Sequence, residues 1–374
     1  MPDAPANDPD RTSRPIPTAR LSREIKARPG KADATITRQE TLFVHAGKEP
    51  PVVKTRVERV KRAGAGKGQD YRVIVEVDGV RVDRRASPLP LKGKFVKPAR
   101  RRQSETALAQ KLTGFVPDHL EVSLRPTQKA ERFQRIRTDA TRGRKVPTTV
   151  FAPDNRLVFQ DTAYPWCTTG LVETNRGAGS GTMIGPRHLV TVSHVIDWTA
   201  PAGFAADWVR FTPSYFDGTA PFGEAYGAHI YWYVQEDGDG FISGNEGLFD
   251  YVVVVLDRRL GEHTGWMGAR GYDDDWDSLA AWSHIGYPAD LNSGQRPTFQ
   301  GGFTMDGSDA DAQEILHRAD VFPGQSGGPM FGWWSGDVGP RVVAVQSWQN
   351  GTDNGASGSM DMRDLVALAR TEFA

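Results

Sequence analysis

From about Val150 onward, short apolar runs recur between clusters of Gly, Pro, Asn and Asp. About ten such runs in about 220 residues, with no long helical pattern between them, predict an all-β sandwich or barrel rather than a parallel α/β sheet. The runs are LVFQ, TTGLVET, SGTMIG, HLVTVSHV, WVRFTP, AHIYWYV, DYVVVVL, LAAWSHIGYP, TFQGGF, GGPMFGWW and RVVAVQSW. The last segment, DMRDLVALARTEF, instead places Leu365, Val366 and Leu368 on one face, which predicts a terminal helix.

The N-terminal part has a weaker pattern. Residues 1–40 are rich in Pro, Ala, Asp and Arg without apolar periodicity, so we expect them to be disordered. Between Val52 and Val82, the runs VVKTRVERV and YRVIVEVDGVRV alternate apolar with polar residues and predict a small β unit. The Asp78-Gly79 pair suits a tight hairpin turn.

Two basic, Pro-interrupted stretches, LKGKFVKPARRR and TRGRKVP, flank an amphipathic segment near Ser104–Leu112, where Ser104 would cap a helix. We therefore divide the chain into a disordered segment 1–40, a basic region 41–149 and a β-rich domain 150–374.

Charge is distributed unevenly between these parts. The whole chain has 46 Lys plus Arg and 46 Asp plus Glu, but residues 1–150 hold 34 basic and 17 acidic residues, a net charge of +17. Residues 151–374 therefore carry −17; they contain all ten Trp and no lysine. The two parts differ in chemical character, and their opposite charges would favour docking of one on the other.

The composition is that of a globular protein. The mean hydropathy of −0.49 and the lack of an 18-residue apolar run argue against a membrane-spanning helix. The start MPDAPANDPD has no basic or apolar signal region, so we expect no secretory signal, and intracellular and bacterial-extracellular settings both remain open. Cys167 is the single cysteine, so no internal disulfide can form.

The strongest short motif is Gly-Gln-Ser-Gly-Gly-Pro at positions 324–329. Glycines around a serine permit a tight turn with exposed backbone N–H groups, which is what an oxyanion site requires. The donors would be the amides of Gly324 and Ser326. The alternative is a Gly-rich hairpin carrying a surface serine.

Two further residues suit acid–base chemistry. His194 follows the apolar strand HLV, where a general base could be held rigidly, although a buried structural histidine is the alternative. Asp250 precedes the apolar run YVVVVL, and a buried carboxylate there needs a donor such as an imidazole N–H. Asp257, Asp237 and Asp239 are rival acids, but they lack a following buried strand or lie in a Gly-rich acidic loop.

The order His194, Asp250, Ser326 matches one of the convergent serine-hydrolase arrangements. With the stretches DNRLVFQDTAYPW, GSGTMIGPRHLVTVSHVI, DYVVVVL, HIGYP and ADVFPGQSGGPMF, residues 150–374 resemble a chymotrypsin-fold serine protease, most of all the bacterial V8-like, glutamyl endopeptidase-type branch. The resemblance implies two six-stranded antiparallel β-barrels with a C-terminal helix. It also implies that Ser326 is the nucleophile, His194 the general base and Asp250 the residue that orients the base.

The resemblance also locates a substrate pocket, implying Asp320, Val321, Gln346, Ser347, Trp348 and Gln349 as its residues. Glu-preferring relatives have threonine where this chain has Val321 and histidine where it has Gln346, so a preference for Glu is in doubt. Asp320 occupies a position that favours Arg or Lys in trypsin-like relatives. A structural hydrogen-bonding role for Asp320 is the alternative.

Other features carry less weight. The acidic runs at 236–240 and 273–277 lack EF-hand spacing, so we expect solvated surface and no metal site. His317 would line the substrate cleft or, alternatively, pack in the core. Cys167 has no neighbouring histidine in sequence and is expected to be a small buried residue rather than a nucleophile.

Together these features predict a serine endopeptidase that acts on proteins or peptides through an acyl-enzyme, without a cofactor. The basic region would be a pro-region or regulatory segment that docks on the acidic domain, with cleavage near Lys145 or Val150. The alternatives are a basic protein that binds nucleic acid or an anionic surface, and a protease-fold binding module. The basic region's only tyrosine, Tyr71, leaves little aromatic surface for base stacking, so nucleic acid is not the expected partner.

Overall fold

The structure is a computed structural model of the 374-residue chain. It describes residues 14–31, 38–41, 52–60, 70–77, 89–98, 112–129, 150–151, 153–236, 242, 244–308, 313–349 and 353–374. The predicted Asp78-Gly79 turn, the predicted helix near 104–112, and Asp237 and Asp239 lie outside these residues, apart from Leu112.

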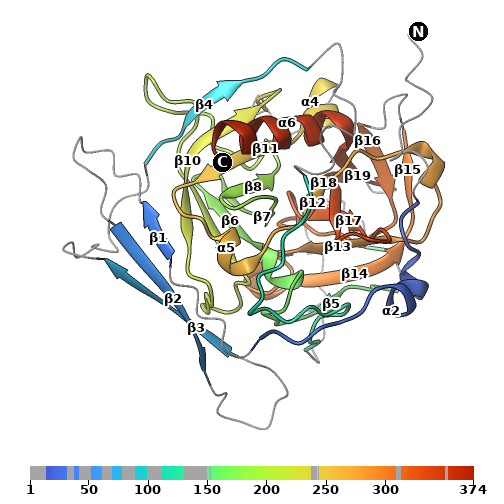
Figure 1. The fold of residues 1–374 in the computed structure, drawn as a ribbon. Helices are drawn as coiled ribbons and strands as arrows, with labels where there is room; N and C mark the ends of the chain where they lie inside the picture. The colour runs from blue at the N-terminus through green and yellow to red at the C-terminus, as the bar shows by residue number, and fades with distance from the viewer. Residues whose placement is uncertain are drawn as a thin grey trace, which may run out of the picture.

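Six antiparallel strands form a closed first barrel (Figure 1). Its order is β11-β8-β7-β6-β9-β10, and β10 pairs with β11 to close the ring. These strands alternate short apolar runs with turns, as the sequence pattern predicts. Their bounds are β6 Thr169–Thr174, β7 Gly177–Met183, β8 His188–Thr191, β9 Val209–Pro213, β10 Ala225–Trp232 and β11 Val252–Leu256.

The second sheet runs β15-β16-β19-β18-β17-β13-β14-β5, and β12 pairs with β18. Thr304 alone separates β14 from β15, which lie near opposite ends of this path, but no pairing joins the two ends, so the sheet is a half-barrel. The bounds are β5 Leu157–Val158, β12 Gly268–Ala269, β13 Trp282–Gly286, β14 Thr298–Phe303, β15 Met305–Gly307, β16 Glu314–His317, β17 Pro329–Gly332, β18 Arg341–Gln349 and β19 Asn354–Gly358.

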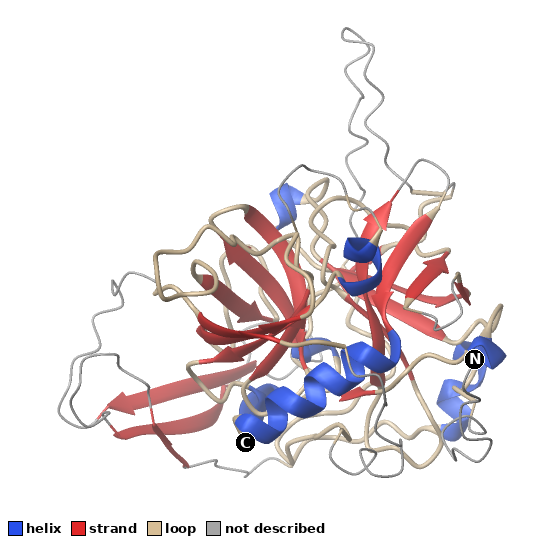
Figure 2. Ribbon diagram, turned by 90° about the horizontal axis from the view of Figure 1, so that it is seen from above, coloured by secondary structure: helices blue, strands red, loops and turns tan. Residues whose placement is uncertain are grey.

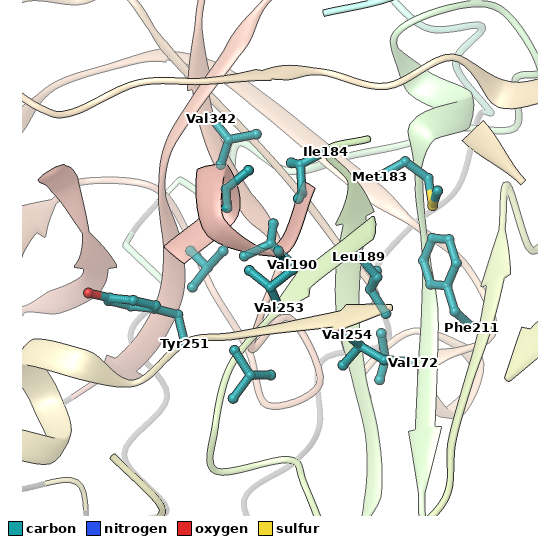
Figure 3. Packing of buried hydrophobic residues seen from close by; sticks show 14 of the residues in the cluster. Val172, Met183, Ile184, Leu189, Val190, Phe211, Tyr251, Val253, Val254 and Val342 are labelled. Atoms are coloured by element: carbon teal, nitrogen blue, oxygen red, sulfur yellow. The ribbon is translucent and has the colours of Figure 1, made fainter. Parts of the chain in front are cut away.

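The first barrel is filled by branched aliphatic side chains from facing strands (Figure 3). Val190, Val253 and Val254 are fully buried there, together with Leu189 and Phe211. The run YVVVVL predicts this, because a strand buried on both faces is continuously apolar. This packing holds the ends of β8 and β11 in place, where the predicted base and acid lie.

In the part of the chain that the structure describes, the helices are short except at the C-terminus (Figure 2). The predicted terminal helix is present as α6, whose Met362, Leu365, Val366 and Ala369 are buried, whereas Leu368 is only partly buried. α6 lies against β8 and β11 of the first barrel and β18 of the second sheet. No described helix is long and apolar enough to span a membrane. The helical bounds are η1 Thr18–Arg20, α2 Leu21–Glu24, η3 Trp166–Thr168, α4 Asn245–Phe249, α5 Gly261–Thr264, η4 Asp274–Trp276, η5 Asn292–Gly294 and α6 Ser359–Glu372.

The predicted small β unit is a three-stranded antiparallel sheet in the order β1-β2-β3. Its strands are β1 Arg38–Thr41, β2 Val52–Val60 and β3 Asp70–Val77. The predicted all-β class is thereby confirmed, with one closed six-stranded barrel, a C-terminal helix and a small N-terminal β unit. The second sheet differs from the six-stranded barrel that the resemblance implies, because it has nine strands and forms a half-barrel.

Parts of the N-terminal region differ from expectation. Residues 14–31 lie within the segment expected to be disordered, yet Ile16 and Leu21 are buried against Trp333 and its neighbours. The Ile16 backbone N–H donates to the Trp333 carbonyl at 2.7 Å. Two isolated apolar residues create no periodicity, but each supplies enough buried surface to anchor a short segment.

Other N-terminal segments are built into the first barrel. Strand β4, Lys92–Phe95, pairs in parallel with β10, and the preceding Leu91 is fully buried in the core. Leu112 is fully buried in the same core, and Leu120 is fully buried in a separate cluster with Tyr164 and Trp333. Lys94 Nζ lies 2.5 Å from Glu372 Oε1 on α6. The predicted boundary at residue 150 therefore does not coincide with a break in packing.

Candidate active site

Strand register brings His194 and Asp250 together. In the antiparallel β8–β11 pair, Thr191 lies opposite Val252. His194 follows the end of β8 in a tight turn, and Asp250 lies just before β11 begins. The His194 Nδ1 atom lies 2.6 Å from Asp250 Oδ2, and the His194 backbone N–H donates to Asp250 Oδ1 at 3.0 Å. The carboxylate thus holds both the ring and the backbone of the histidine.

A third donor completes the surroundings of Asp250. The Ser347 hydroxyl donates to Asp250 Oδ2 at 2.6 Å, and the carboxylate is almost fully buried. Burial alone would raise the pKa of Asp250, but the His194 charge and the hydrogen bonds from His194 and Ser347 lower it overall. Asp250 is therefore held ionised beside the ring.

The pKa of His194 is displaced in the opposite direction. Burial disfavours the charged imidazole, but the Asp250 charge and hydrogen bond outweigh burial and raise the pKa of His194. The ring remains one-fifth exposed. This combination suits a base that must accept a proton and be stabilised as imidazolium.

The Ser326 loop lies against the same part of the first barrel. The Ser180 backbone N–H on β7 donates to the Ser326 carbonyl at 2.7 Å. Gly327 has a φ of +83°, and a Cβ there would lie 2.2 Å from the Ser180 carbonyl and 2.3 Å from Thr191 Oγ1. Only glycine fits so close to β8, which explains the glycine after the serine. The serine is thus set beside the turn that carries His194.

Two backbone amides are available beside the serine. Among the described residues, the N–H groups of Gly324 and Ser326 donate to no protein acceptor, as an oxyanion site requires. Within the same residues, the Ser326 hydroxyl makes no hydrogen bond, including to His194. Nucleophile–base contacts are often longer before substrate binds.

Of the rival acids, Asp257 is described. Its carboxylate accepts the Tyr226 backbone N–H at 2.9 Å, at the far end of β11 from Asp250. Burial raises the pKa of Asp257. The acid adjoining His194 is Asp250, as the sequence argument prefers.

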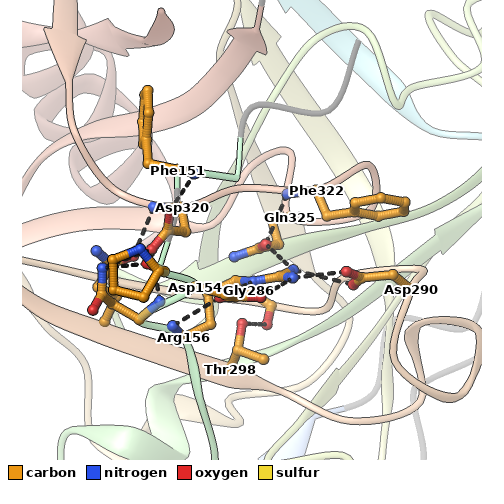
Figure 4. A network of polar contacts seen from close by, with 12 residues as sticks. Phe151, Asp154, Arg156, Gly286, Asp290, Thr298, Asp320, Phe322 and Gln325 are labelled. Atoms are coloured by element: carbon orange, nitrogen blue, oxygen red, sulfur yellow. Dashed lines mark hydrogen bonds and ion pairs between the residues drawn. The ribbon is translucent and has the colours of Figure 1, made fainter. Parts of the chain in front are cut away.

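Asp320 is occupied by hydrogen bonds within the fold (Figure 4). Its carboxylate accepts the Phe151 backbone N–H at 2.7 Å and the Asn155 backbone N–H at 2.9 Å, and the residue is fully buried. Burial raises the pKa of Asp320 despite these donors. Of the two roles considered for Asp320, these contacts support hydrogen bonding within the fold rather than pairing with a substrate cation.

The other predicted pocket residues lie in different surroundings. Val321 is buried, and Ser347 is buried with its hydroxyl on Asp250. Gln346 is buried and its Nε2 donates to the Trp348 carbonyl at 3.0 Å. Trp348 and Gln349, at the end of β18, are partly exposed. A role for Ser347 in holding Asp250 is not visible in the sequence, because the contact joins residues 97 positions apart.

The weaker candidates are structural. His317 is buried, and burial, with a smaller effect from His284, lowers the pKa of His317 to about 3, so the core alternative fits it. Cys167 is buried, and its thiol donates to the Thr264 carbonyl, as expected of a small core residue. In the second acidic run, Asp273 caps η4. The residues that the structure describes contain no cluster of three or more acidic, histidine or cysteine side chains that could hold a metal ion.

A closed antiparallel barrel, a second half-barrel, a C-terminal helix and a His–Asp pair beside a Gly-flanked serine are the arrangement of chymotrypsin-like serine proteases. No family model matches the chain. The chain is 26% identical over 217 residues to a glutamyl endopeptidase of Bacillus licheniformis, and the matched residues make up 57% of this chain. The match spans 64%, less than two thirds, of that relative's length. The resemblance to the V8-like branch is thereby confirmed.

Solved structures of similar shape include two proteases. A Glu endopeptidase in complex with MPD has 21% identity and a TM-score of 0.47, covering 59% of this chain and 99% of that one. The protease Anisep from Arthrobacter nicotinovorans has 19% identity and a TM-score of 0.42, covering 57% of this chain and 99% of that one.

Proposed function

We propose that this protein is a serine endopeptidase with Ser326 as nucleophile, His194 as general base and Asp250 as the residue that orients the base. The observation that carries the proposal is that Asp250 holds His194 at two points. Its Oδ2 lies 2.6 Å from His194 Nδ1, and its Oδ1 accepts the His194 backbone N–H at 3.0 Å. A surface histidine does not need two bonds to one buried carboxylate. A base that must keep one ring nitrogen facing a nucleophile does.

In the proposed reaction, Ser326 Oγ attacks the substrate carbonyl carbon while His194 Nε2 accepts the hydroxyl proton. The carbonyl oxygen becomes negative and is stabilised by the amides of Gly324 and Ser326. Collapse breaks the peptide C–N bond, and His194 returns the proton to the leaving amine. Water then hydrolyses the acyl-enzyme by the same steps and frees Ser326. Every step uses side chains and backbone of this chain, and we propose no cofactor.

The resemblance to a glutamyl endopeptidase supports the reaction class and a protein or peptide substrate. It does not carry a preference for Glu to this chain, because Gln346 stands where the resemblance implies histidine. The contacts of Asp320 with Phe151 and Asn155 likewise argue against a preference for Arg or Lys based on that carboxylate. We propose that the partly exposed Trp348 and Gln349 border the pocket.

We also propose that the N-terminal region docks within the chain. The pairing of β4 with β10 and the Lys94–Glu372 ion pair support this. We propose in addition that this region regulates the protease, and that the chain divides by composition into parts at residues 40 and 149.

Labelling with a fluorophosphonate tests the proposed function. The reagent phosphonylates an activated serine, so the wild-type protein should be labelled on the peptide that contains Ser326. Ser326→Ala should abolish both labelling and cleavage of a peptide library, whereas Ser335→Ala, at an exposed serine of the second half-barrel, should alter neither. An unlabelled wild-type protein that cleaves no library peptide would refute the proposal and favour a binding role for this fold.

A further inference from the structure

A buried arginine outside the proposed triad, Arg156, contacts Gln325, the residue before Ser326 (Figure 4). Arg156 is fixed by two carboxylates, and 2% of its side chain is exposed. Its guanidinium donates to Asp290 at 2.7 and 3.1 Å and to Asp154 at 2.8 and 3.0 Å. Four bonds in a planar fork define the position of this group more sharply than a single ion pair would.

The same guanidinium reaches the residue before the proposed nucleophile. Arg156 Nη1 lies 3.4 Å from Gln325 Oε1, which also accepts the Phe322 backbone N–H at 2.9 Å. Gln325 is buried. A Cβ on Gly286 would lie 2.8 Å from Gln325 Cβ, so the glycine permits β13 to lie directly against this side chain. Gln325 is therefore clamped between the arginine and its own loop.

The two free amides of the loop are aimed by the carbonyls of their own peptide units. In a trans peptide, the N–H points away from the C=O. The Pro323 carbonyl accepts the Ala289 N–H at 2.8 Å. Because this carbonyl and the Gly324 N–H belong to one peptide unit, the Gly324 N–H points away from Ala289. The Gln325 carbonyl accepts the Gly328 N–H at 2.9 Å, so the Ser326 N–H of the same peptide unit points away from Gly328.

Arg156 is connected to both of these carbonyls. Asp290, which it binds through both oxygens, directly follows Ala289, whose N–H holds the Pro323 carbonyl. Gln325, which it binds through Oε1, carries the second carbonyl. Burial opposes the charge on Arg156, but the hydrogen bonds with Asp154 and then Asp290 outweigh it and raise the pKa of the guanidinium. Arg156 therefore stays positively charged and links the loop that contains Asp290 to the loop that contains Gln325.

We propose that Arg156 is a positioning residue that fixes the direction of the Gly324 and Ser326 amides through Asp290 and Gln325. This inference rests on the proposed function, since the amides matter only if an oxyanion forms. Arg156 touches neither the proposed nucleophile nor the base. Its loss should therefore weaken binding of the transition state more than binding of the substrate.

The test compares Arg156→Lys with Arg341→Lys. Arg341 is a matched control, because it is also buried and binds both oxygens of one carboxylate, Asp337, at 2.6 and 2.7 Å. It begins β18, five residues from Gln346 along the strand, which is about 17 Å at the usual rise per residue. A lysine at either site keeps the charge but cannot reproduce the fork.

Four quantities are measured for each folded variant: kcat and KM for a peptide cleaved by the wild type, and the affinities for a peptide aldehyde and its matching alcohol. The aldehyde adds the serine oxygen and forms an oxyanion, whereas the alcohol binds without one. For Arg156→Lys we expect kcat and aldehyde affinity to fall on the order of 10²-fold, as when an oxyanion donor is lost. We expect KM and alcohol affinity to stay near wild type, and Arg341→Lys to change none of these values.

A second variant keeps the proposal testable if Arg156→Lys does not fold. Gln325→Met removes the acceptor of the Arg156 bond but leaves both ion pairs, and it should lower kcat and aldehyde affinity without changing alcohol affinity. Wild-type kcat in folded Arg156→Lys, or equal losses of aldehyde and alcohol affinity, would overturn the positioning role. A wild-type protein that neither reacts with fluorophosphonate nor cleaves peptides would instead overturn the proposed function, and this inference with it.

Discussion

Replacing Asp250 with asparagine tests the proposed triad most sharply, because the side chain keeps its shape and only one oxygen becomes an amino group. Asp250 Oδ1 accepts the His194 backbone N–H, which cannot turn away. The new amino group must therefore take the place of Oδ2, because two donors would otherwise face each other. There it faces His194 Nδ1 and the Ser347 hydroxyl.

The hydroxyl of Ser347 can rotate to accept a hydrogen bond, but the imidazole can accept one only by carrying its proton on Nε2. That tautomer cannot take a proton from Ser326. We expect kcat to fall by about 10⁴, the loss that the wrong tautomer causes in a trypsin-type triad. This corresponds to about 5 kcal/mol in activation free energy. KM should change little, because Asp250 is buried behind the ring.

The assay is steady-state hydrolysis of a peptide that the wild type cleaves, as a function of pH. Besides the loss in kcat, the acid limb of kcat/KM should move to lower pH, because the Asp250 charge that raises the pKa of His194 is gone. The control is Asp257→Asn, which changes a partly buried carboxylate just past the other end of β11 and should leave activity near wild type.

An Asp250→Asn protein with activity within tenfold of wild type would refute the tautomer argument. If Asp257→Asn were the inactive variant instead, the acid of the proposed triad would have to be reassigned. A folded Asp250→Asn protein with lower kcat but an unmoved acid limb would show that the carboxylate acts on something other than the imidazole.

Three further outcomes are expected. In the wild type, kcat/KM should fall as pH decreases through the pKa of His194, and this midpoint should lie above 6.5, because the base must be neutral and its pKa is raised. Leu91→Ala should destabilise the protein by about 2–5 kcal/mol in urea unfolding, since Leu91 is fully buried, whereas Leu89→Ala at a half-exposed position should change stability little. Asp320→Asn should lower stability but leave the ratio of kcat/KM for matched Arg and Glu peptides unchanged; a changed ratio would place this carboxylate in the pocket after all.

The local pattern around His194 and Asp250 pointed to these two residues, and the structure brings their side chains within 2.6 Å of each other. His194 follows β8, which contains the apolar pair Leu189-Val190, and Asp250 precedes β11, which is apolar throughout; these two strands pair inside the barrel. Glycines around Ser326 indicated a tight turn, and the structure shows the contact with Ser180 and Thr191 that requires one of them. Local sequence carries this information because a turn and a strand end are local features.

The partners of individual polar groups could not be predicted in the same way. Asp320 binds the segment around Phe151, 169 positions earlier in the chain, and nothing in either stretch encodes the pairing. Ser347 was expected in the pocket but its hydroxyl turns to Asp250. A carboxylate or hydroxyl has several equally good partners, so its choice depends on the tertiary fold. The burial of Arg156 likewise depends on the tertiary fold, which brings Asp290 and Gln325 to it.

The N-terminal region raises the question of what holds it to the barrels. Charges of +17 and −17 would attract, but at physiological salt this attraction is largely screened beyond a Debye length of about 8 Å. Leu91, Leu112 and Leu120 are fully buried, and burial is not screened. Deleting residues 1–149 would remove core side chains, so lost activity would report unfolding rather than regulation. Cutting an engineered protease site at residues 142–145 of the intact protein avoids this. We expect the two fragments to remain together in gel filtration at both low and 1 M salt; separation at high salt alone would show that charge, and not apolar packing, holds them.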